Sequence, residues 1–283
     1  MNKAAEELVG YRYSVGTYGF IQLKDVMGDD ERVVDAARIS YGLHENDRSE
    51  SKDRSLLRHL MRHRHTSPFE QCEMVFIIQS PMDVWRQWIR HRTASVNEYS
   101  TRYTEALDMM AYTAPNQWRL QDQDNKQGSN LIMVDEEMGK NLSNRENQLH
   151  SMTRTIYQER LAAGIAREQA RKDLPLSTMT VAYWKIDTHN LLHFLSLRMD
   201  PHAQLEIREF ATAIFEHFFQ PAFPLIAEAF TDYVLEAVTF SRMELQALSV
   251  MLDTKDFSED LADFGLEGRE AKEFLAKLEQ IHG

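Results

Sequence analysis

The sequence lacks several features that define special classes of protein. Its 283 residues contain a single cysteine, Cys72, so an intrachain disulfide framework is excluded and a reducing, cytoplasmic setting is expected. The longest apolar runs, such as Met74–Ile78, are far too short to cross a bilayer. The first ten residues have no apolar core of the kind that a secretory signal carries. Fixed-period repeats are also absent, which argues against a solenoid.

Positive charge is scarce as well. The chain has 32 lysines and arginines against 44 acidic residues, and the resulting net charge of −12 argues against broad binding to nucleic acids. The hydrophobic fraction of 43% and the charged fraction of 27% are ordinary for a globular protein with a sizeable core. One short stretch is nevertheless basic, because its only acid is Glu98 while its basic residues are Arg86, Arg90, His91, Arg92 and Arg102. Such a local patch favours a small anionic ligand.

Hydrophobic periodicity predicts an α+β fold, with a central antiparallel or mixed sheet flanked by helices and a helical C-terminal extension. Strands are expected at Gly19–Val26, Glu73–Gln79 and Ser177–Ile186, with one or two more within Asp108–Trp118. The main domain is expected to span residues 1–238 and the acidic extension residues 239–283. Within that extension, Asp253–Gly283 contains nine acids and four bases and is expected to form exposed helix.

Helical spacing and capping signals predict a series of helices. These are Glu31–Arg38, Ser51–His63, Pro81 to about Arg90, Asn144–Ala163, Ala166–Asp173, Thr188–Arg198, Ala203–Phe219 and Pro221–Phe230. Ser143 and Glu146 have capping-box spacing and are expected at the start of the long helix. Arg92–Thr101 is expected to be an ordered loop and Gln121–Asn130 an exposed one.

The basic stretch has the composition of a nucleotide-phosphate site. Arg90–Arg92 offers guanidinium groups, which bind phosphates through paired, charge-assisted hydrogen bonds. Ser100 and neighbouring backbone N–H groups provide further donors, while Asn97 and Glu98 offer acceptors for a ribose or a base edge. The alternative from the residues alone is a solvated basic loop with internal salt bridges. A protein that only senses a nucleotide and one that binds nucleic acid through this stretch are further alternatives.

The motif is similar to a known family signature. Arg90-His91-Arg92 followed after seven residues by Ser100 resembles the RHR-x7-S signature of flavin-dependent thymidylate synthases. Three further segments resemble that family in the same order, namely HTSPFE at 65–70, RKDLPL at 171–176 and RMDPHAQ at 198–204. The resemblance covers about residues 38–208 and makes residues 1–238 the catalytic domain.

The resemblance implies a methyltransferase that converts dUMP to dTMP by reductive methylation. It implies FAD as cofactor, NADPH and methylenetetrahydrofolate as co-substrates, and no nucleic-acid or membrane partner. It also implies a homotetramer whose sites are shared between subunits, with Arg171 reaching the nucleotide from a neighbouring subunit. The implied dUMP contacts are Gln87, Arg90, Glu98, Tyr99, Ser100, Thr101, Arg102, Arg171 and Arg198. The implied FAD contacts are Ser67, Arg90, His91, Arg92, Glu98, Asp187, His189 and His193. Arg198 is implied to stabilise charge at the uracil N3/C4 edge, and His65 to gate folate entry.

Two side chains invite a nucleophile interpretation. Ser100 needs a general base within hydrogen-bond reach, and its sequence neighbours are arginines and a tyrosine, which favours phosphate binding. Cys72 lies beside an apolar strand with no basic partner evident, which favours a structural role.

Two pairs at helical spacing also have alternative interpretations. His189 and His193 are four residues apart, a spacing that suits a metal, but no third ligand is evident nearby. Trp85 and Trp88 are three residues apart and are expected to pack in the core rather than to stack on a ligand.

Overall fold

The computed structural model describes residues 3–42, 49–123, 126, 128–251 and 261–282. The chain divides into two compact units, Met1–Leu235 and Glu236–Gly283. Among the described residues, no helix is both long and apolar enough to cross a membrane.

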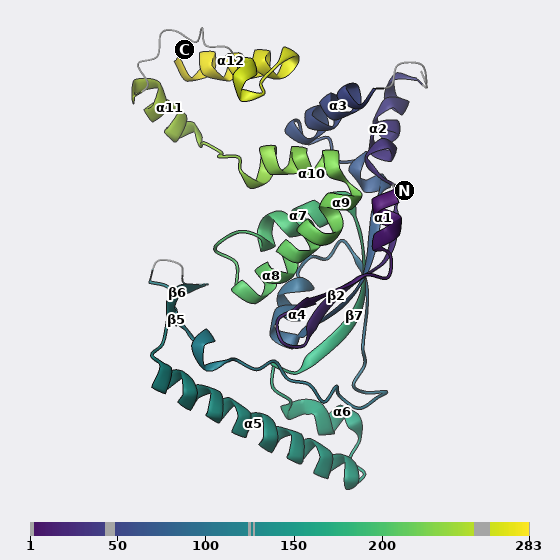
Figure 1. The fold of residues 1–283 in the computed structure, drawn as a ribbon, viewed down its shortest axis with the longest axis vertical. Coiled ribbons are helices and arrows are strands. Elements are labelled where there is room, and N and C mark those ends of the chain that lie inside the picture. The colour runs from purple at the N-terminus through teal and green to yellow at the C-terminus, as the bar shows by residue number, and fades with distance from the viewer. Residues whose placement is uncertain (1–2, 43–48, 124–125, 127, 252–260, 283) are drawn as a thin grey trace. The chain divides into compact units, whose positions relative to one another are not determined.

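A five-stranded sheet forms the centre of the first unit (Figure 1). Its strands are β1 (Arg12–Val15), β2 (Gly19–Met27), β3 (Glu73–Pro81), β4 (Ser95–Glu98) and β7 (Met179–Asp187), arranged in the order β1-β2-β3-β7-β4. Every neighbouring pair is antiparallel, as the sequence analysis allowed, and a bulge interrupts β2 between Leu23 and Asp25. In β3 and β7 alternate side chains are buried, so one face of the sheet carries the core.

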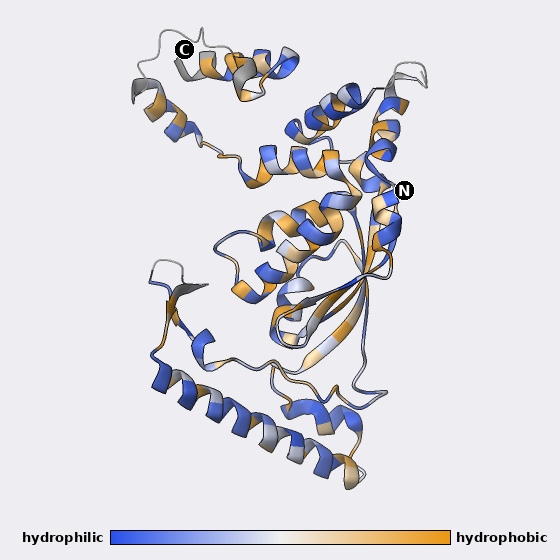
Figure 2. Ribbon diagram, in the orientation of Figure 1, coloured by the Kyte–Doolittle hydropathy of each residue, from blue (hydrophilic) through white to orange (hydrophobic). Residues whose placement is uncertain are grey.

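Three helices bury that face of the sheet. They are α4 (Met82–Trp88), α7 (Thr188–Arg198) and α8 (Leu205–Ile214), and Figure 2 shows their apolar positions. The ring of Trp88 lies at the centre, with centroids 5.1 Å from Trp184, 4.8 Å from Phe194 and 5.8 Å from Phe210. Trp85 is buried beside it, which confirms that both tryptophans of α4 belong to the core. This packing fixes the C-terminal ends of α4 and α7.

The long helix α5 (Glu136–Ala162) begins two turns earlier than the sequence analysis predicted. Its N-cap is Asp135, whose carboxylate accepts from the backbone N–H of Met138, so the prediction of a cap at Ser143 was wrong. Ser143 lies inside the helix and is buried, where it accepts from Trp118 Nε1 at 2.9 Å. Glu146 accepts from the backbone N–H of Thr113 at 2.7 Å. Both side chains therefore attach the preceding segment to α5.

Two further predictions were wrong in the segment before α5. Asp108–Trp118 contains an isolated bridge between Met110 and Thr178 and a 3-10 turn at Pro115–Gln117, in place of a strand. Proline at position 115 lacks the N–H that a ladder requires. The Arg92–Thr101 segment is ordered, but Ser95–Glu98 forms the edge strand β4, paired with β7, instead of a loop.

The expected exposed loop is the turn of a small hairpin. It connects β5 (Arg119–Gln121) and β6 (Ser129–Met133), and part of the predicted Gln121–Asn130 segment lies outside the described residues.

The remaining elements include α1 (Lys3–Leu8), which the sequence analysis did not predict, and helices at the other predicted places, some of them divided into shorter segments. These helices are α2 (Asp30–Arg38), α3 (Glu50–Arg62), α6 (Arg167–Ala170), α9 (Gln220–Ala222) and α10 (Pro224–Phe230). Short 3-10 turns occur at Ile39–Tyr41, Phe69–Gln71 and Arg171–Asp173, and π-helical turns at Phe215–Phe219 and Thr231–Leu235. The second unit contains α11 (Arg242–Met251), a 3-10 turn at Leu261–Phe264 and α12 (Gly268–His282), and is helical as expected.

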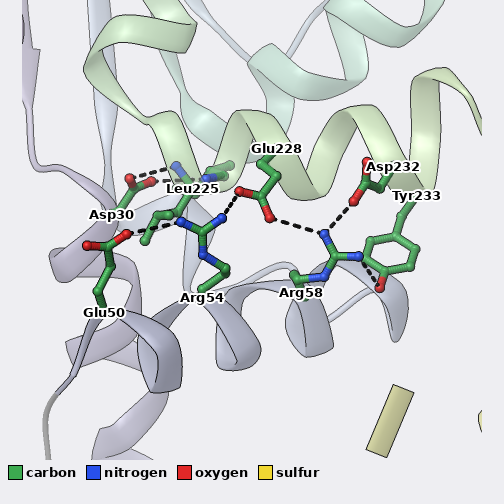
Figure 3. A network of polar contacts seen from close by, with 9 residues as sticks. Asp30, Glu50, Arg54, Arg58, Leu225, Glu228, Asp232 and Tyr233 are labelled. Carbon is green, nitrogen blue, oxygen red and sulfur yellow. Dashed lines mark hydrogen bonds and ion pairs between the residues drawn. The ribbon is translucent and has the colours of Figure 1, made fainter. Parts of the chain in front are cut away.

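A polar network joins α3 to the end of α10 (Figure 3). Arg58 contacts Glu228 at 3.2 Å and the Tyr233 hydroxyl at 3.1 Å, and Arg54 also pairs with Glu228. Asp30 accepts from the first backbone N–H groups of α10, and burial raises the pKa of this carboxyl to about 6. The network therefore connects α2 and α3 to α10 and the turn that follows it.

Candidate active site

One group of predicted site residues gathers where α4 and α7 end. Arg198 is the last residue of α7, and its Nε donates to His91 Nε2 at 3.0 Å. Its Nη2 donates to the backbone carbonyl of Gln87, near the end of α4, at 3.4 Å. Gln87, His91 and Arg198 are called the α4–α7 group below. They come together because the buried tryptophan and phenylalanine rings hold the two helices side by side.

The contact between His91 and Arg198 constrains the protonation of both. Burial lowers the pKa of His91 to about 4, and electrostatic interaction with Arg198 and His193 lowers it further. A neutral imidazole accepts the Arg198 proton at Nε2, which assigns the His91 proton to Nδ1. Burial also lowers the pKa of Arg198, although a guanidinium stays charged. Arg198 is therefore a cation held by two neutral acceptors.

A second group lies around the end of β4. Glu98 accepts from the Thr180 hydroxyl at 2.8 Å, and Arg171 Nη1 donates to the Thr101 hydroxyl at 2.7 Å. The backbone N–H of Tyr99 continues the pairing to β7 by donating to the carbonyl of Val181 at 2.8 Å. The chain turns at Ser100, whose carbonyl accepts from the backbone N–H groups of Tyr103 and Thr104. The Oγ of Ser100 accepts from the backbone N–H of Arg102 at 3.4 Å. The β4-end group denotes Glu98, Tyr99, Ser100, Thr101, Arg102 and Arg171.

Four predicted ligand-binding arginines carry unbalanced charge. Within the part of the chain that the structure describes, no ion pair involves Arg90, Arg92, Arg102 or Arg171, whereas Arg119 pairs with Glu206. Arg90, Arg92 and Arg102 are exposed, and Arg171 is half-buried. Concentrated cations without acidic partners favour an anionic ligand, which is the alternative that the sequence left open against internal salt bridges.

The N-terminus of α7 holds the remaining predicted FAD contacts. Asp187 caps the helix, and its two carboxylate oxygens accept from the backbone N–H and the side-chain amide of Asn190 at 2.9 and 2.7 Å. His193 is exposed, with its ring centroid 5.8 Å from that of His91. His189 is half-buried one helical turn before His193. Asp187 thus has a structural partner in its own helix.

His65 and Ser67 lie in the turn between α3 and β3, and both are exposed. The His65 ring centroid is 5.7 Å from His59 and 6.2 Å from His63, so three histidines gather at this end of α3. The 3-10 turn at Phe69–Gln71, which follows directly, packs against α7. Ser67, two residues before this turn, therefore lies close in the chain to a segment that packs on α7.

The structure gives neither alternative nucleophile a suitable environment. Cys72 is buried, its thiol donates to the carbonyl of Asp29 at 3.6 Å, and burial raises its pKa to about 11. The contacts described for Ser100 join it to backbone groups, and none of them supplies a general base.

Sequence reasoning missed three polar residues beside the predicted ones. Thr180 meets Glu98 only because β4 pairs with β7, a pairing that the sequence did not reveal. Asp83 and Gln204 form a hydrogen-bonded chain to Gln87. Gln204 stood within the quoted 198–204 segment, but a lone glutamine carries no signal of its own.

Comparison with known proteins decides the family. Residues 22–225 match the family model described as "Thymidylate synthase complementing protein", and residues 238–281 match "Thymidylate synthase ThyX C-terminal domain". A flavin-dependent thymidylate synthase of Thermus thermophilus is 44% identical over 260 residues, which cover 92% of this chain and 93% of the relative. The chain belongs to the flavin-dependent thymidylate synthases. It is accordingly an enzyme, a dUMP methyltransferase.

Other relatives agree with this family. The flavin-dependent thymidylate synthase of Wolbachia pipientis wMel is 40% identical, covering 98% of this chain and 96% of the relative. Among solved structures, a UMP/dUMP methylase, PolB, from Streptomyces cacaoi bound with 5-Br dUMP aligns with a TM-score of 0.71 and 31% identity. That alignment covers 78% of this chain and 98% of PolB. The α+β fold with its antiparallel sheet is thus that of a flavin-dependent thymidylate synthase.

Proposed function

We propose that this flavin-dependent thymidylate synthase uses FAD as its flavin, NADPH as reductant and methylenetetrahydrofolate as carbon donor to convert dUMP into dTMP. When bound, the flavin supplies the hydride transfer that amino-acid side chains cannot perform. The names of the relatives support a flavin, and the 5-Br dUMP in PolB supports a pyrimidine nucleotide.

The residues present suit a flavin dinucleotide. Arg90 and Arg92 are exposed guanidiniums, and the described residues place no carboxylate in an ion pair with either, so both are available to a pyrophosphate. His91 between them is neutral and adds no third charge. His193 and Ser67 offer exposed polar groups for the rest of the cofactor. Asp187 is the exception, because Asn190 engages both of its carboxylate oxygens, and we assign it to holding α7 in place.

Arg198 is proposed to stabilise the negative charge that develops on the uracil N3/C4 edge. The observation that carries this role is that its guanidinium is held by a neutral imidazole and a backbone carbonyl, so that its full charge remains for the substrate. Replacing Arg198 with alanine should lower kcat by ~10²–10³ while FAD content stays normal. Arg208→Ala is the matched control, because Arg208 also donates to a backbone carbonyl, that of Pro201. Near-normal dTMP formation by Arg198→Ala would exclude the role.

The β4-end group is proposed to bind the nucleotide. Arg102 and Arg171 provide the positive charge for the phosphate, and Ser100 and Thr101 provide hydroxyl groups at the same turn. Ser100→Ala should therefore raise the KM for dUMP and leave kcat measurable. If Ser100→Ala instead abolished turnover with nucleotide affinity intact, the hydroxyl would act as a nucleophile and the binding role would be rejected.

We extend the proposal to a homotetramer in which each site combines the α4–α7 group of one subunit with the β4-end group of another. The resemblance implied that Arg171 comes from a different subunit than Ser100, but the contact between Arg171 and Thr101 within one chain supports assigning both to the same half of the site. Mixing inactive Arg198→Ala and Arg171→Ala proteins should then restore activity, because a mixed site receives two intact halves. Mixing Arg171→Ala with Ser100→Ala should restore none, since both changes damage the same half. Equal behaviour of the two mixtures would contradict shared sites.

The flavin itself gives the direct test. The purified protein, or the protein after incubation with FAD, should be yellow and should form dTMP only when dUMP, methylenetetrahydrofolate and NADPH are all supplied. A colourless protein that FAD does not reconstitute would overturn the proposed function.

A further inference from the structure

A chain of polar side chains leads from the interior to Gln87. The amide nitrogen of Gln204 donates to Asp83 Oδ2 at 3.4 Å, and hydrogen bonding by the Gln204 side chain also lowers the pKa of the Glu206 carboxyl. The amide oxygen of Gln204 accepts from Gln87 Nε2. All four side chains are partly buried, and Asp83 and Gln87 come from α4 while Glu206 lies in the first turn of α8.

The two carboxylates determine which way the Gln204 amide points. An ionised carboxylate can only accept hydrogen bonds, so both must face the NH2 end of Gln204. Burial raises the pKa of Asp83, and the hydrogen bond from Gln204 opposes this rise. The salt bridge from Arg119 holds Glu206 in its charged form. Burial alone would raise the pKa of Glu206. The hydrogen bonds from Arg119 and Gln204 have the larger combined effect, so the pKa lies below its usual value. Turning the amide over would place the Gln204 oxygen against negative charge, which is unfavourable.

The orientation of the Gln204 amide determines the orientation of the Gln87 amide. Because Gln204 presents its oxygen, Gln87 must present its own NH2 group in return. The side-chain oxygen Oε1 of Gln87 is then left for a ligand. The backbone carbonyl of the same residue holds Arg198, so this oxygen belongs to the α4–α7 group.

We propose that Gln204 is a positioning residue which, with Asp83 and Glu206, fixes the Gln87 amide with its oxygen towards the nucleotide. The fixed oxygen selects a hydrogen-bond donor on the nucleotide, either the pyrimidine N3–H or the 3′-hydroxyl of the deoxyribose. The inference rests on the proposed nucleotide site. It assigns the three residues a role in substrate recognition, without contact to the reacting atoms.

The test uses the flavin-loaded enzyme and dUMP affinity, followed by equilibrium titration and by KM. Gln204→Met keeps an unbranched side chain of similar size but removes the amide. Loss of one oriented hydrogen bond should weaken dUMP binding by about 3- to 10-fold while kcat at saturating dUMP changes little. Asp83→Asn should weaken it less, because Glu206 still orients the amide. The double variant should be no worse than Gln204→Met, since both changes act through one chain.

Two controls separate positioning from general damage. Glu209→Gln removes a neighbouring exposed carboxylate of α8 that lies outside the chain of hydrogen bonds, and it should leave dUMP affinity unchanged. Two analogues identify the selected donor, namely N3-methyl-dUMP and 2′,3′-dideoxyuridine monophosphate. The analogue that lacks the selected donor should bind wild type and Gln204→Met equally, whereas the other should retain the full difference.

The outcomes are distinguishable. Wild type that takes up no dUMP would overturn the proposed function and this inference together. Wild type that binds dUMP normally, with Gln204→Met and Asp83→Asn both within twofold of it and correctly folded by circular dichroism, would overturn only the positioning role. A loss confined to kcat, or additive losses in the double variant, would also reject it.

Discussion

The contact between His91 and Arg198 makes the pKa of one imidazole a measurable test of the site. The structure puts that pKa at about 4 against an ordinary value of 6.5, with burial as the largest cause and the Arg198 charge next. The drop from 6.5 to about 4 corresponds to an affinity for the proton that is weaker by roughly two to three orders of magnitude. His91 in the ligand-free enzyme should therefore stay neutral throughout the range from pH 5 to pH 8. The imidazole resonances in NMR spectra report this directly, and His91→Gln assigns the signal.

Replacing Arg198 separates the two causes. Arg198→Met removes the neighbouring charge but keeps most of the side-chain volume, so burial of His91 persists. The pKa of His91 should rise and yet remain below 6.5, because the larger cause is unchanged. A wild-type pKa at or above 6.5 would contradict the prediction, because His91 would then be charged over much of the range from pH 5 to pH 8, and an imidazolium cannot accept from Arg198. Failure of Arg198→Met to raise the pKa would show that the two groups do not interact.

The same shift affects stability with a defined sign. Because the folded-state pKa of His91 lies below the unfolded value, the unfolded chain binds more protons between pH 6.5 and about pH 4. The free energy of unfolding should thus be undiminished above pH 6.5 and should fall as the pH drops through this window. His91→Gln should show a shallower fall in Tm over the same range, which thermal denaturation of the ligand-free enzyme measures. An identical fall would refute the assignment.

Three further predictions concern the scaffold. Gly139→Ala should lower stability by about 1–3 kcal/mol in urea denaturation, because its Cβ would lie 2.0 Å from the backbone oxygen of Pro115. Ser143→Ala should also cost about 1–3 kcal/mol, since it leaves the partly buried indole N–H of Trp118 without its acceptor, and tryptophan fluorescence during unfolding will detect this. Cys72 should resist alkylation by iodoacetamide at pH 8 in the native enzyme but react in urea, because its thiol is buried with a pKa of about 11. Rapid native labelling would contradict its structural role.

The sequence correctly predicted the elements whose buried side chains follow a regular apolar pattern along the chain. The β-branched and aromatic run at 177–186 became β7, and the helix after it begins and ends at the predicted residues, Thr188 and Arg198. Their apolar side chains face one buried layer, so local periodicity and tertiary packing agree. This agreement also explains why the two tryptophans of α4 were correctly expected in the core.

The failures occur where tertiary pairing decides the structure. All four residues of β4 are exposed, so no alternation of polar and apolar residues marks it as a strand. Ser143 and Glu146 have the spacing of a capping box, but their partners are in the segment that packs along α5, and only the folded chain identifies them. The same limit applies to Gln204, whose two carboxylate partners come from different helices.

The structure also changes how the RHR-x7-S motif is understood. In the sequence Arg90 and Ser100 form one motif, but β4 runs between them, and the two ends acquire different neighbours. The first end joins Arg198 through His91, while the second joins Arg171 through Thr101. A carboxylate at position 91 would hold Arg198 as firmly but would neutralise its charge, whereas a neutral imidazole fixes the guanidinium and leaves that charge for a ligand. The histidine between the two arginines is therefore the residue that connects the binding motif to the arginine proposed to stabilise the reacting pyrimidine.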